Sequence, residues 1–381
     1  MIIQGSRVFV AGQFMKAQLH IRDGKISEVL PYGTQKPDVD YGENMLIPGL
    51  IDVHTHGAYG YAADEGTEPG LINWLEKLPE EGVTAFLPTT VTNVDEATMA
   101  ALANIANVMA KKPKGAEILG AHLEGPFLDT DFRGAHETKL LKVPTVAMFD
   151  KFQEAAKGTI KYMTLATEHD EQFALTKHAS QNGVVVSIGH SSARSDDAVL
   201  AIANGASCFT HSFNGMRGLH QREPGVVGAL MTSNVFAELI PDGHHVHPNV
   251  MNILFKAKNN SKLVLVSDSL IGKGLPAGTY ERDGFAIEVD ESGTARILGT
   301  ETLAGSSLKM NMGIKLLVER SMVSIEHAIL AATYYPAQVL GIEKQKGQIA
   351  AFADADLTVL DERFNVVQTY CLGEAMLGAK A

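Results

Sequence analysis

The sequence predicts an α/β protein, a (β/α)₈ TIM barrel with a small β-sandwich domain formed by both chain ends. Starting at Pro48, eight apolar, strand-like runs recur with helical or loop segments between them, as in repeated βα units around a parallel sheet. Polar residues end these runs, which favours a closed barrel over an open doubly wound sheet. No glycine-rich dinucleotide fingerprint is present, and both chain ends consist of short strand-like runs and turns.

The eight predicted barrel strands are recognised by their apolar centres and by the polar or glycine residues that end them. In chain order they are LIDVHTHG ending near Gly57, VTAFLPTT near Thr90, EILGAHLEGP near Pro126, IKYMTLATE near Glu168, VVVSIGHS near Ser191, SCFTHSFNG near Gly215, VFAELIPDGHH near His245 and KLVLVSDS near Ser269. The carboxyl ends of barrel strands meet at one rim, so we expect these polar residues to lie together.

The predicted barrel spans residues 49–346. Residues 1–48 carry IIQGSRVFV and AQLHIRDGKISEVL, and residues 347–381 carry DLTVLDERFNVVQTYCLG, so we expect the two ends to pair into one small β domain. A hairpin-like stretch near 278–300, GTYERDGFAIEVDESGTARIL, has turn signals at Asp283-Gly284 and Ser292-Gly293. We predict that this stretch is an insertion in the barrel.

The composition is typical of a globular protein, because 45% of the 381 residues are hydrophobic and 20% are charged. A formal net charge of −12 argues against nucleic acid or an anionic membrane as partner, since its field repels polyanions. The N-terminus has no signal-peptide pattern, and no stretch reaches about 18 uncharged apolar residues. We therefore expect a cytoplasmic protein whose cysteines, Cys208 and Cys371, are reduced core residues.

Histidines and carboxylates at the strand ends predict a metal site. His54 and His56 are two apart on the first strand, so both imidazoles project from one face. Taken alone, such a pair is a weak signal, because strand histidines that bond to the backbone would also explain it. The third, fifth, sixth and eighth strands end in Glu124, His190, His211 and Asp268, and the barrel rim would bring all six residues together.

Four imidazoles with one bridging carboxylate are suitable ligands for one or two divalent metals such as zinc or iron. A metal bound there would lower the pKa of water toward neutrality and polarise a carbonyl, while the second carboxylate moves protons. The residues therefore predict a hydrolase.

The ordered motifs of this chain resemble those of the amidohydrolase superfamily, and within it the family of N-acetylglucosamine-6-phosphate deacetylases. The resemblance covers nearly the whole chain. It rests on LIPGLIDVHTHG, HLEGPF, GHSSA, THSFNGM, REPGVVGA, PDGHHVHP, VSDS and LAGSSLKM, which occur in the family's order. It implies hydrolysis of the N-acetyl group of N-acetylglucosamine 6-phosphate in amino-sugar catabolism by a cytoplasmic homodimer.

The same resemblance assigns roles to individual residues. Glu124, His190 and His211 would hold the principal metal, and His54 and His56 a second one, with zinc the first choice and iron, manganese or cobalt compatible. Asp268 would be the general base and then the general acid. His136, in RGAHE, would stabilise the negative charge that develops on the acetyl oxygen.

For the phosphosugar, the resemblance implies a phosphate clamp of Arg222 and His245, completed across a dimer interface. The planar guanidinium of Arg222 would bind phosphate oxygens bidentately. The substrate-binding residues implied are Ala135, His136, Asn214, Gly215, Arg222, Asp242, Gly243, His244, His245, Leu303, Ala304 and Gly305.

Three other interpretations remain open on the sequence. An enzyme on the same barrel could act on the galactosamine isomer. The two sugars differ in the orientation of one hydroxyl, and the pocket geometry that distinguishes them cannot be read from the sequence. Another could hydrolyse a cyclic amide or a nucleobase, which Arg222 and His245 disfavour. A non-catalytic scaffold is disfavoured, since such a protein would be expected to lose ligands and this chain has the full set.

Overall fold

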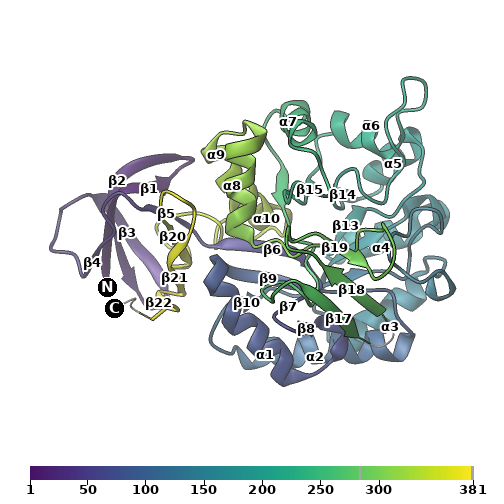
Figure 1. Cartoon of the computed structure of the whole chain (residues 1–381), viewed down its shortest axis with the longest axis horizontal. Coiled ribbons are helices and arrows are strands. Elements are labelled where there is room, and N and C mark those ends of the chain that lie inside the picture. Colours follow the sequence, from purple (N-terminus) through teal and green to yellow (C-terminus); the bar gives the residue numbers. More distant parts are fainter. Residues whose placement is uncertain (283–284, 379–381) are drawn as a thin grey trace.

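The computed structural model describes residues 1–282 and 285–378. Its centre is a curled parallel sheet in which successive strands lie side by side (Figure 1). The strands that pair in chain order are β6 (Leu50–Thr55), β9 (Val83–Thr90), β11 (Ala121–Glu124), β12 (Ile160–Leu165), β13 (Val185–Ile188) and β14 (Ala206–Phe209), with β10 (Glu117–Ile118) also on β9. A separate parallel pair follows, β15 (Ala237–Leu239) and β16 (Leu263–Leu265).

Individual backbone hydrogen bonds connect this pair to both edges of the longer sheet. On one side, Phe236 N donates to Ser207 O at 3.0 Å, linking the segment before β15 to β14. On the other side, Asp268 N, beyond β16, donates to His54 O of β6 at 2.8 Å. The core is therefore TIM-barrel-like, with eight parallel strands in chain order.

Helices cover the outside of this sheet, which explains why its strands are apolar along almost their whole length. Trp74 packs its indole against Phe86 of β9 at 5.1 Å between ring centroids, and both are fully buried. The helices are α1 (Glu68–Lys77), α2 (Asp95–Lys111), α3 (Val146–Ala155), α4 (Ala174–Gln181), α5 (Ser195–Ala203), α6 (Gly225–Thr232), α7 (Pro248–Ala257), α8 (Met310–Ser321), α9 (Ile325–Ala332) and α10 (Tyr334–Val339). The short 3₁₀ helices are η1 (Ala63–Glu65), η2 (Leu78–Glu81), η3 (Thr138–Leu140), η4 (Thr167–His169) and η5 (Glu171–Phe173).

The two chain ends share one eight-stranded sheet, with the order β22-β21-β20-β5-β1-β2-β3 and β4 on β1. Its strands are β1 (Ile2–Val10), β2 (Gln13–Arg22), β3 (Lys25–Pro31), β4 (Val39–Asp40), β5 (Met45–Pro48), β20 (Leu357–Leu360), β21 (Val366–Cys371) and β22 (Glu374–Ala375). The ends meet where β5 pairs antiparallel with β20, and both termini lie on this side of the molecule (Figure 1). Because pairing runs without a break through one sheet, the predicted sandwich of two sheets is not confirmed.

The stretch after β16 forms a small antiparallel sheet of β17 (Gly278–Arg282), β18 (Phe285–Val289) and β19 (Ala295–Ile297). The predicted turn at Asp283-Gly284 lies outside the described residues. The predicted turn at Ser292-Gly293 is present: Asp290 accepts from Ser292 N at 2.8 Å, and Gly293 has the left-handed φ of 83° that favours glycine. Two short strands, β7 (Gly57–Ala58) and β8 (Tyr61–Ala62), follow β6.

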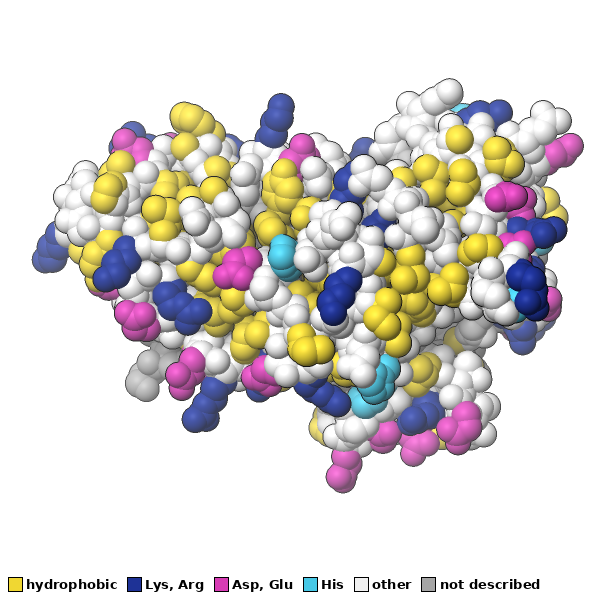
Figure 2. Space-filling view, turned by 90° about the horizontal axis from the view of Figure 1, so that it is seen from above, with side chains coloured by type: hydrophobic (Ala, Val, Ile, Leu, Met, Phe, Trp, Pro, Cys, Tyr) yellow, Lys and Arg dark blue, Asp and Glu magenta, His cyan; other side chains and the backbone are white. Residues whose placement is uncertain are grey.

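Within residues 1–282 and 285–378, every helix is too short or too polar to traverse a bilayer. Figure 2 shows basic and acidic side chains interspersed over one face of the molecule, with apolar side chains between them.

A buried charge cluster joins the terminal sheet to the barrel. The Lys346 ammonium, 2% exposed, lies 2.6 Å from Asp356, 2.9 Å from Asp354 and 2.6 Å from Glu117 of β10. Burial disfavours the charged lysine, but the carboxylates of Asp356 and Glu117 outweigh it and raise the pKa of Lys346. One cation therefore neutralises acidic groups on both sides of the junction.

We expect Lys346→Met to lower the free energy of unfolding by about 3–5 kcal/mol, because it leaves buried carboxylates without a counter-charge. Lys25 is a matched control, since it pairs with the same Asp354 at 2.8 Å from a half-exposed position. Lys25→Met should cost at most about 1 kcal/mol. Chemical denaturation measures both, and equal losses would contradict the role of burial.

Candidate active site

The six predicted site residues lie at the carboxyl end of the barrel strands. His54 and Glu124 are the residues of β6 and β11 that face this end, and His56, His190, His211 and Asp268 follow β6, β13, β14 and β16 within three residues. All six are buried, with residue exposures between 0 and 8%. His190, His211 and Asp268 have φ of 46°, 27° and 47°, in the left-handed region that non-glycine residues rarely adopt. Strained backbone thus aims three of these side chains.

Glu124 is the centre of this cluster. Its Oε2 lies 3.0 Å from Nε2 of His56 and 3.3 Å from Nε2 of His54. Its Oε1 lies 3.4 Å from Nε2 of both His190 and His211. Asp268 Oδ1 faces the same opening, 3.2 Å from Nε2 of His56. The carboxylate of Glu124 therefore bridges two pairs of imidazoles.

Each of these imidazoles bonds through Nδ1 to an oxygen that only accepts, so Nδ1 carries a proton. The acceptors are Glu238 Oε2 for His54 at 2.9 Å, Thr89 O for His56 at 3.2 Å, Phe132 O for His190 at 2.8 Å and Asn214 O for His211 at 3.1 Å. Each Nε2 is left to take either a second proton or a metal ion.

The inner faces of these side chains fit a divalent metal. Nε2 of His190 and Nε2 of His211 are 3.0 Å apart, so two protonated rings there would repel each other. Glu124 Oε1 is buried and has no hydrogen-bond partner among the described residues. An orphaned carboxylate oxygen beside paired imidazole nitrogens is a donor set that a cation satisfies, and nitrogen with oxygen suits zinc or iron.

The charges of the site agree with cation binding. Burial raises the pKa of Glu124, but the imidazoles around it, His54 first, bring it well below its usual range. The pKa of Asp268 is lowered in the same way by His54 and His56, so both carboxylates are ionised. Burial lowers the pKa of His56, whereas Asp268 and Glu124 raise it to about 9. A metal ion must then displace a proton from His56.

His136 faces this centre from the loop after β11, with Nε2 3.6 Å from Glu124 Oε2. Thr92 N donates to Nδ1 of His136 at 3.3 Å, and the Thr92 hydroxyl lies 2.8 Å from the same nitrogen. A backbone N–H can only donate, so Nδ1 accepts and the proton of the neutral ring is on Nε2. Burial lowers the pKa of His136 to about 4, which favours this neutral form. The ring therefore presents an N–H to the centre.

A cavity of about 390 Å³ opens above the cluster. The predicted substrate residues that line it are Ala135, His136, Asn214, Gly215, His245, Leu303, Ala304 and Gly305. Gly215 also packs against a ligand histidine: a Cβ there would lie 2.9 Å from His190 Nδ1, and its φ is 54°. Tyr280 and Ile287 of the insertion form an apolar part of the wall.

The structure places four predicted substrate residues away from that wall. Asp242 instead holds His245, accepting from its Nδ1 at 2.6 Å, and His244 faces the insertion through Thr294 at 3.0 Å. Gly243 lies in the same turn, with φ of 80°. Arg222 is exposed on the loop before α6 and does not line the cavity. Within one chain, the structure does not bring the predicted clamp of Arg222 and His245 together.

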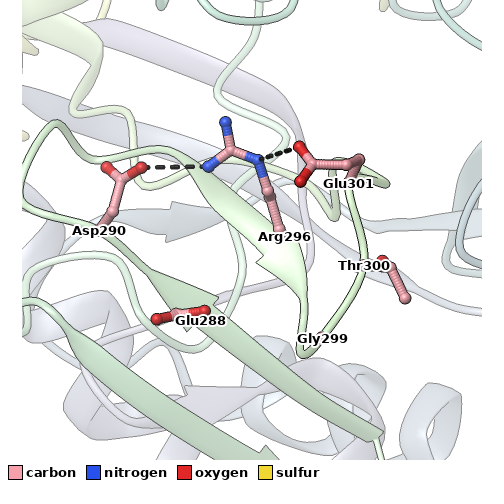
Figure 3. A pocket seen from close by; sticks show the side chains of 6 residues that line it. All are labelled: Glu288, Asp290, Arg296, Gly299, Thr300 and Glu301. Carbon is pink, nitrogen blue, oxygen red and sulfur yellow. Dashed lines mark hydrogen bonds and ion pairs between the residues drawn. The ribbon is translucent and has the colours of Figure 1, made fainter.

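A second pocket, of about 450 Å³, lies on the insertion and is lined by Glu288, Asp290, Arg296, Gly299, Thr300 and Glu301 (Figure 3). The Arg296 guanidinium in this pocket already has acidic partners, because it bonds to Asp290 at 3.1 Å and faces Glu301 at 3.9 Å. None of the histidines of the buried cluster lines this pocket. We assign no chemistry to it.

The amidohydrolase family model matches residues 45–376, most of the chain. The chain belongs to the amidohydrolase family. Within that family it is similar to the N-acetylglucosamine-6-phosphate deacetylases. The Bacillus subtilis deacetylase is 38% identical over 366 residues, 93% of this chain and 91% of the relative, and the human one is 34% identical over 98% and 95%.

Solved structures agree with this placement. An N-acetyl-D-glucosamine-6-phosphate deacetylase variant from Mycobacterium smegmatis, in complex with N-acetyl-D-glucosamine-6-phosphate, aligns with a TM-score of 0.94 at 29% identity over 99% of both chains. The Pasteurella multocida deacetylase aligns with a TM-score of 0.91 at 28% identity over 98% of this chain and 99% of the other. Amidohydrolases are metal-dependent, in agreement with the buried donor set.

Sequence reasoning missed several residues of this amidohydrolase's site. Thr92 and Asn93 line the cavity and come within three residues after β9. The strand-end pattern that predicted the histidines and carboxylates could therefore have predicted them. Asp64 lines it from η1, and Glu238 holds His54 from within β15. Glu238 has no such signal, because a single acidic residue inside an apolar run does not reveal its partner.

We expect His136 to stay neutral, with its proton on Nε2, between pH 5 and 8. Its pKa is lowered to about 4, so the protonated form is lost already below this window, whereas an ordinary histidine would titrate near pH 6.5. Imidazole ¹⁵N shifts in histidine-labelled protein, assigned by comparison with His136→Gln, measure this. A titration midpoint above pH 6 would contradict the assignment.

Proposed function

We propose that this amidohydrolase hydrolyses the N-acetyl group of N-acetyl-D-glucosamine 6-phosphate, giving D-glucosamine 6-phosphate and acetate in amino-sugar catabolism. The observation that carries the proposal is the complete cluster of His54, His56, Glu124, His190 and His211 at the base of the cavity, with Asp268 beside it. It occurs in a chain that is 38% identical to a deacetylase over most of its length.

Glu124, His190 and His211 would hold the principal metal, and His54 and His56 a second one, with Glu124 shared between them. Zinc is our first choice, and the same donors suit iron, manganese or cobalt. A divalent ion bound there polarises the acetyl carbonyl and lowers the pKa of water. The buried walls and the Nδ1 hydrogen bonds hold the imidazoles in place for it.

Asp268 is the proton carrier of the reaction. Its lowered pKa keeps it ionised at neutral pH, so it can accept the proton of the attacking water. The water oxygen bonds to the acetyl carbon, and Asp268 then returns the proton to the sugar nitrogen as the carbon–nitrogen bond breaks. Its backbone N–H donates to His54 O at 2.8 Å, which fixes its position relative to β6.

His136 stabilises the charge that develops on the acetyl oxygen. Its Nε2–H points toward the centre because Thr92 occupies Nδ1. A neutral donor in a buried site acts mainly on the transition state, where the oxygen is negative.

The phosphate end of the cavity is incomplete within one chain. Among the described residues that line it, there is no lysine or arginine, and His245 is the residue of the predicted phosphate clamp that does line it. We propose that the chain is a homodimer in which the exposed Arg222 of each copy reaches the cavity of the other. Asp242, Gly243 and His244 then act on the sugar indirectly, by shaping the turn that carries His245.

The proposed domain boundaries place this site within the barrel. We propose that residues 49–346 form a closed (β/α)₈ barrel with the insertion near 278–300, and that residues 1–48 and 347–381 form the small β domain. Through Tyr280 and Ile287, the insertion adds the apolar wall that faces the substrate.

The test of the reaction is release of acetate from N-acetylglucosamine 6-phosphate by metal-loaded protein. Asp268→Asn should lower kcat by about 10²–10⁴-fold, because an amide cannot accept the proton of water. Its KM, zinc content and melting temperature should stay close to those of the wild type. Retention of more than about a tenth of kcat would place the base elsewhere.

Arg222→Ala should lower kcat/KM on the phosphosugar by about ten- to a hundred-fold, because a charge-assisted bond contributes about 1.5–3 kcal/mol. On unphosphorylated N-acetylglucosamine the change should be small. His245→Ala should act in the same direction but more weakly.

Complementation tests whether Arg222 acts across a dimer. Neither Arg222→Ala nor Asp268→Asn has an intact site alone, but a mixed dimer has one. Co-expression in equal amounts should restore about a quarter of wild-type sites, because half of the dimers are mixed and one of their two sites is complete. No restoration would assign Arg222 to its own chain or to the surface.

A further inference from the structure

Glu238 is a fully buried carboxylate that the proposed reaction does not use. It lies on β15, with an exposure of 0%, beneath the metal-binding cluster. Its Oε2 accepts from Nδ1 of His54 at 2.9 Å and from the backbone N–H of His211 at 3.0 Å. His54 is also fully buried. The carboxylate therefore contacts one ligand histidine through its ring and another through its backbone.

The partner of His54 differs in kind from those of the other three histidines. His56, His190 and His211 each donate Nδ1–H to a neutral backbone carbonyl. His54 alone among these four donates to an anion. An anionic acceptor makes the opposite nitrogen of an imidazole a stronger donor to a metal, which a neutral carbonyl does to a smaller extent.

Glu238 also needs a positive charge beside it. A buried carboxylate loses several kcal/mol of hydration, and Oε1 of Glu238 has no hydrogen-bond partner in the described part of the chain. Within residues 1–282 and 285–378, His54 forms the ion pair with it. The Tyr162 hydroxyl and the Cys208 thiol also face the carboxylate, but burial, together with Glu238, raises the pKa of both groups, so they stay neutral and supply no positive charge. A metal ion at Nε2 of His54 would take the place of a second proton on that ring and supply this charge.

We propose that Glu238 is a positioning residue that determines whether the chain binds a second metal ion. By accepting the Nδ1 proton of His54, it directs the Nε2 of that ring toward Glu124, 3.3 Å away, and favours a positive ion between them. The inference rests on the proposed function, because it assumes that the cluster binds metal. The other explanation is structural: the carboxylate would merely anchor the backbone of His211.

Calorimetric titration of metal-stripped protein with zinc separates these explanations. The wild type should bind two ions per chain. Glu238→Gln keeps an acceptor oxygen but removes the charge. It should lower the affinity for the second ion by about 10- to 100-fold, while the affinity for the first ion is nearly unchanged. Glu81→Gln is the matched control: Glu81 is equally buried but pairs with Lys273 at 2.9 Å, so both ions should bind as in the wild type.

A double-mutant cycle identifies the route of the effect. His54→Asn should remove the second ion by itself. If Glu238 acts through His54, Glu238→Gln added to His54→Asn leaves the affinity of the remaining ion unchanged. If Glu238 acts through the backbone of His211, the added substitution lowers the affinity for the remaining ion, and the proposal is wrong.

One further variant, together with the number of ions that the wild type binds, keeps the outcome decisive. If Glu238→Gln does not fold, Glu238→Asp keeps the charge but withdraws it from Nδ1, and the same selective loss of the second ion is expected. A wild type that binds one ion, or a Glu238→Gln protein that binds both with wild-type affinity, overturns the proposal. A wild type that binds no zinc overturns the proposed function itself, together with this inference.

Discussion

The site depends on one constraint, which is that the Nδ1 proton of each of its four clustered imidazoles is already donated. Three backbone carbonyls and one carboxylate accept these protons, so four Nε2 atoms are left facing Glu124. A neutral pocket could not hold nitrogens 3.0 Å apart without a cation or a shared proton between them. The outer hydrogen bonds thus leave the inner atoms in the state that the proposed metal site requires, and the barrel strands hold those bonds in place.

Backbone geometry contributes as much as side-chain chemistry. His190, His211 and Asp268 have positive φ values immediately after their strands, so each side chain turns inward where a regular strand would continue past the rim. The cost of such conformations, about 1–3 kcal/mol each, has to be met by the packed strands below them. A fully buried sheet, with helices over its outer face, supplies that rigidity.

The opposite end of the cavity is built differently. The metal end is complete in one chain, whereas the phosphate end lacks a fixed cation among its described lining residues, and Arg222 is exposed on its own surface. A small site that must recognise a dianion gains selectivity if a second copy supplies the guanidinium, because the complete pocket then exists only in the assembly. In the proposed dimer, that guanidinium would meet the His245 turn, which Asp242 holds.

The sequence by itself determined the parallel βα core, the pairing of the chain ends, the insertion and the six residues at the rim. Each of these is a local pattern: apolar runs of strand length, turn residues, and polar side chains where a run stops. Strand periodicity places His54 and His56 on one face, and the common direction of parallel strands brings Glu124, His190, His211 and Asp268 to the same end.

Only the tertiary structure decided the rest. The terminal strands form one continuous sheet, so the predicted sandwich is not confirmed. The sequence predicts strands at both chain ends but does not show which strand lies beside which, as β5 does beside β20. Asp242 holds the His245 turn and His244 bonds to Thr294 of the insertion. Arg222 is exposed and does not line the cavity of its own chain. Glu238 reaches His54 from β15, a strand far from β6 in the sequence. Sequence patterns report which residues share an element. They do not report which side chains from different elements meet, and these contacts set the tautomers and charges on which the chemistry depends.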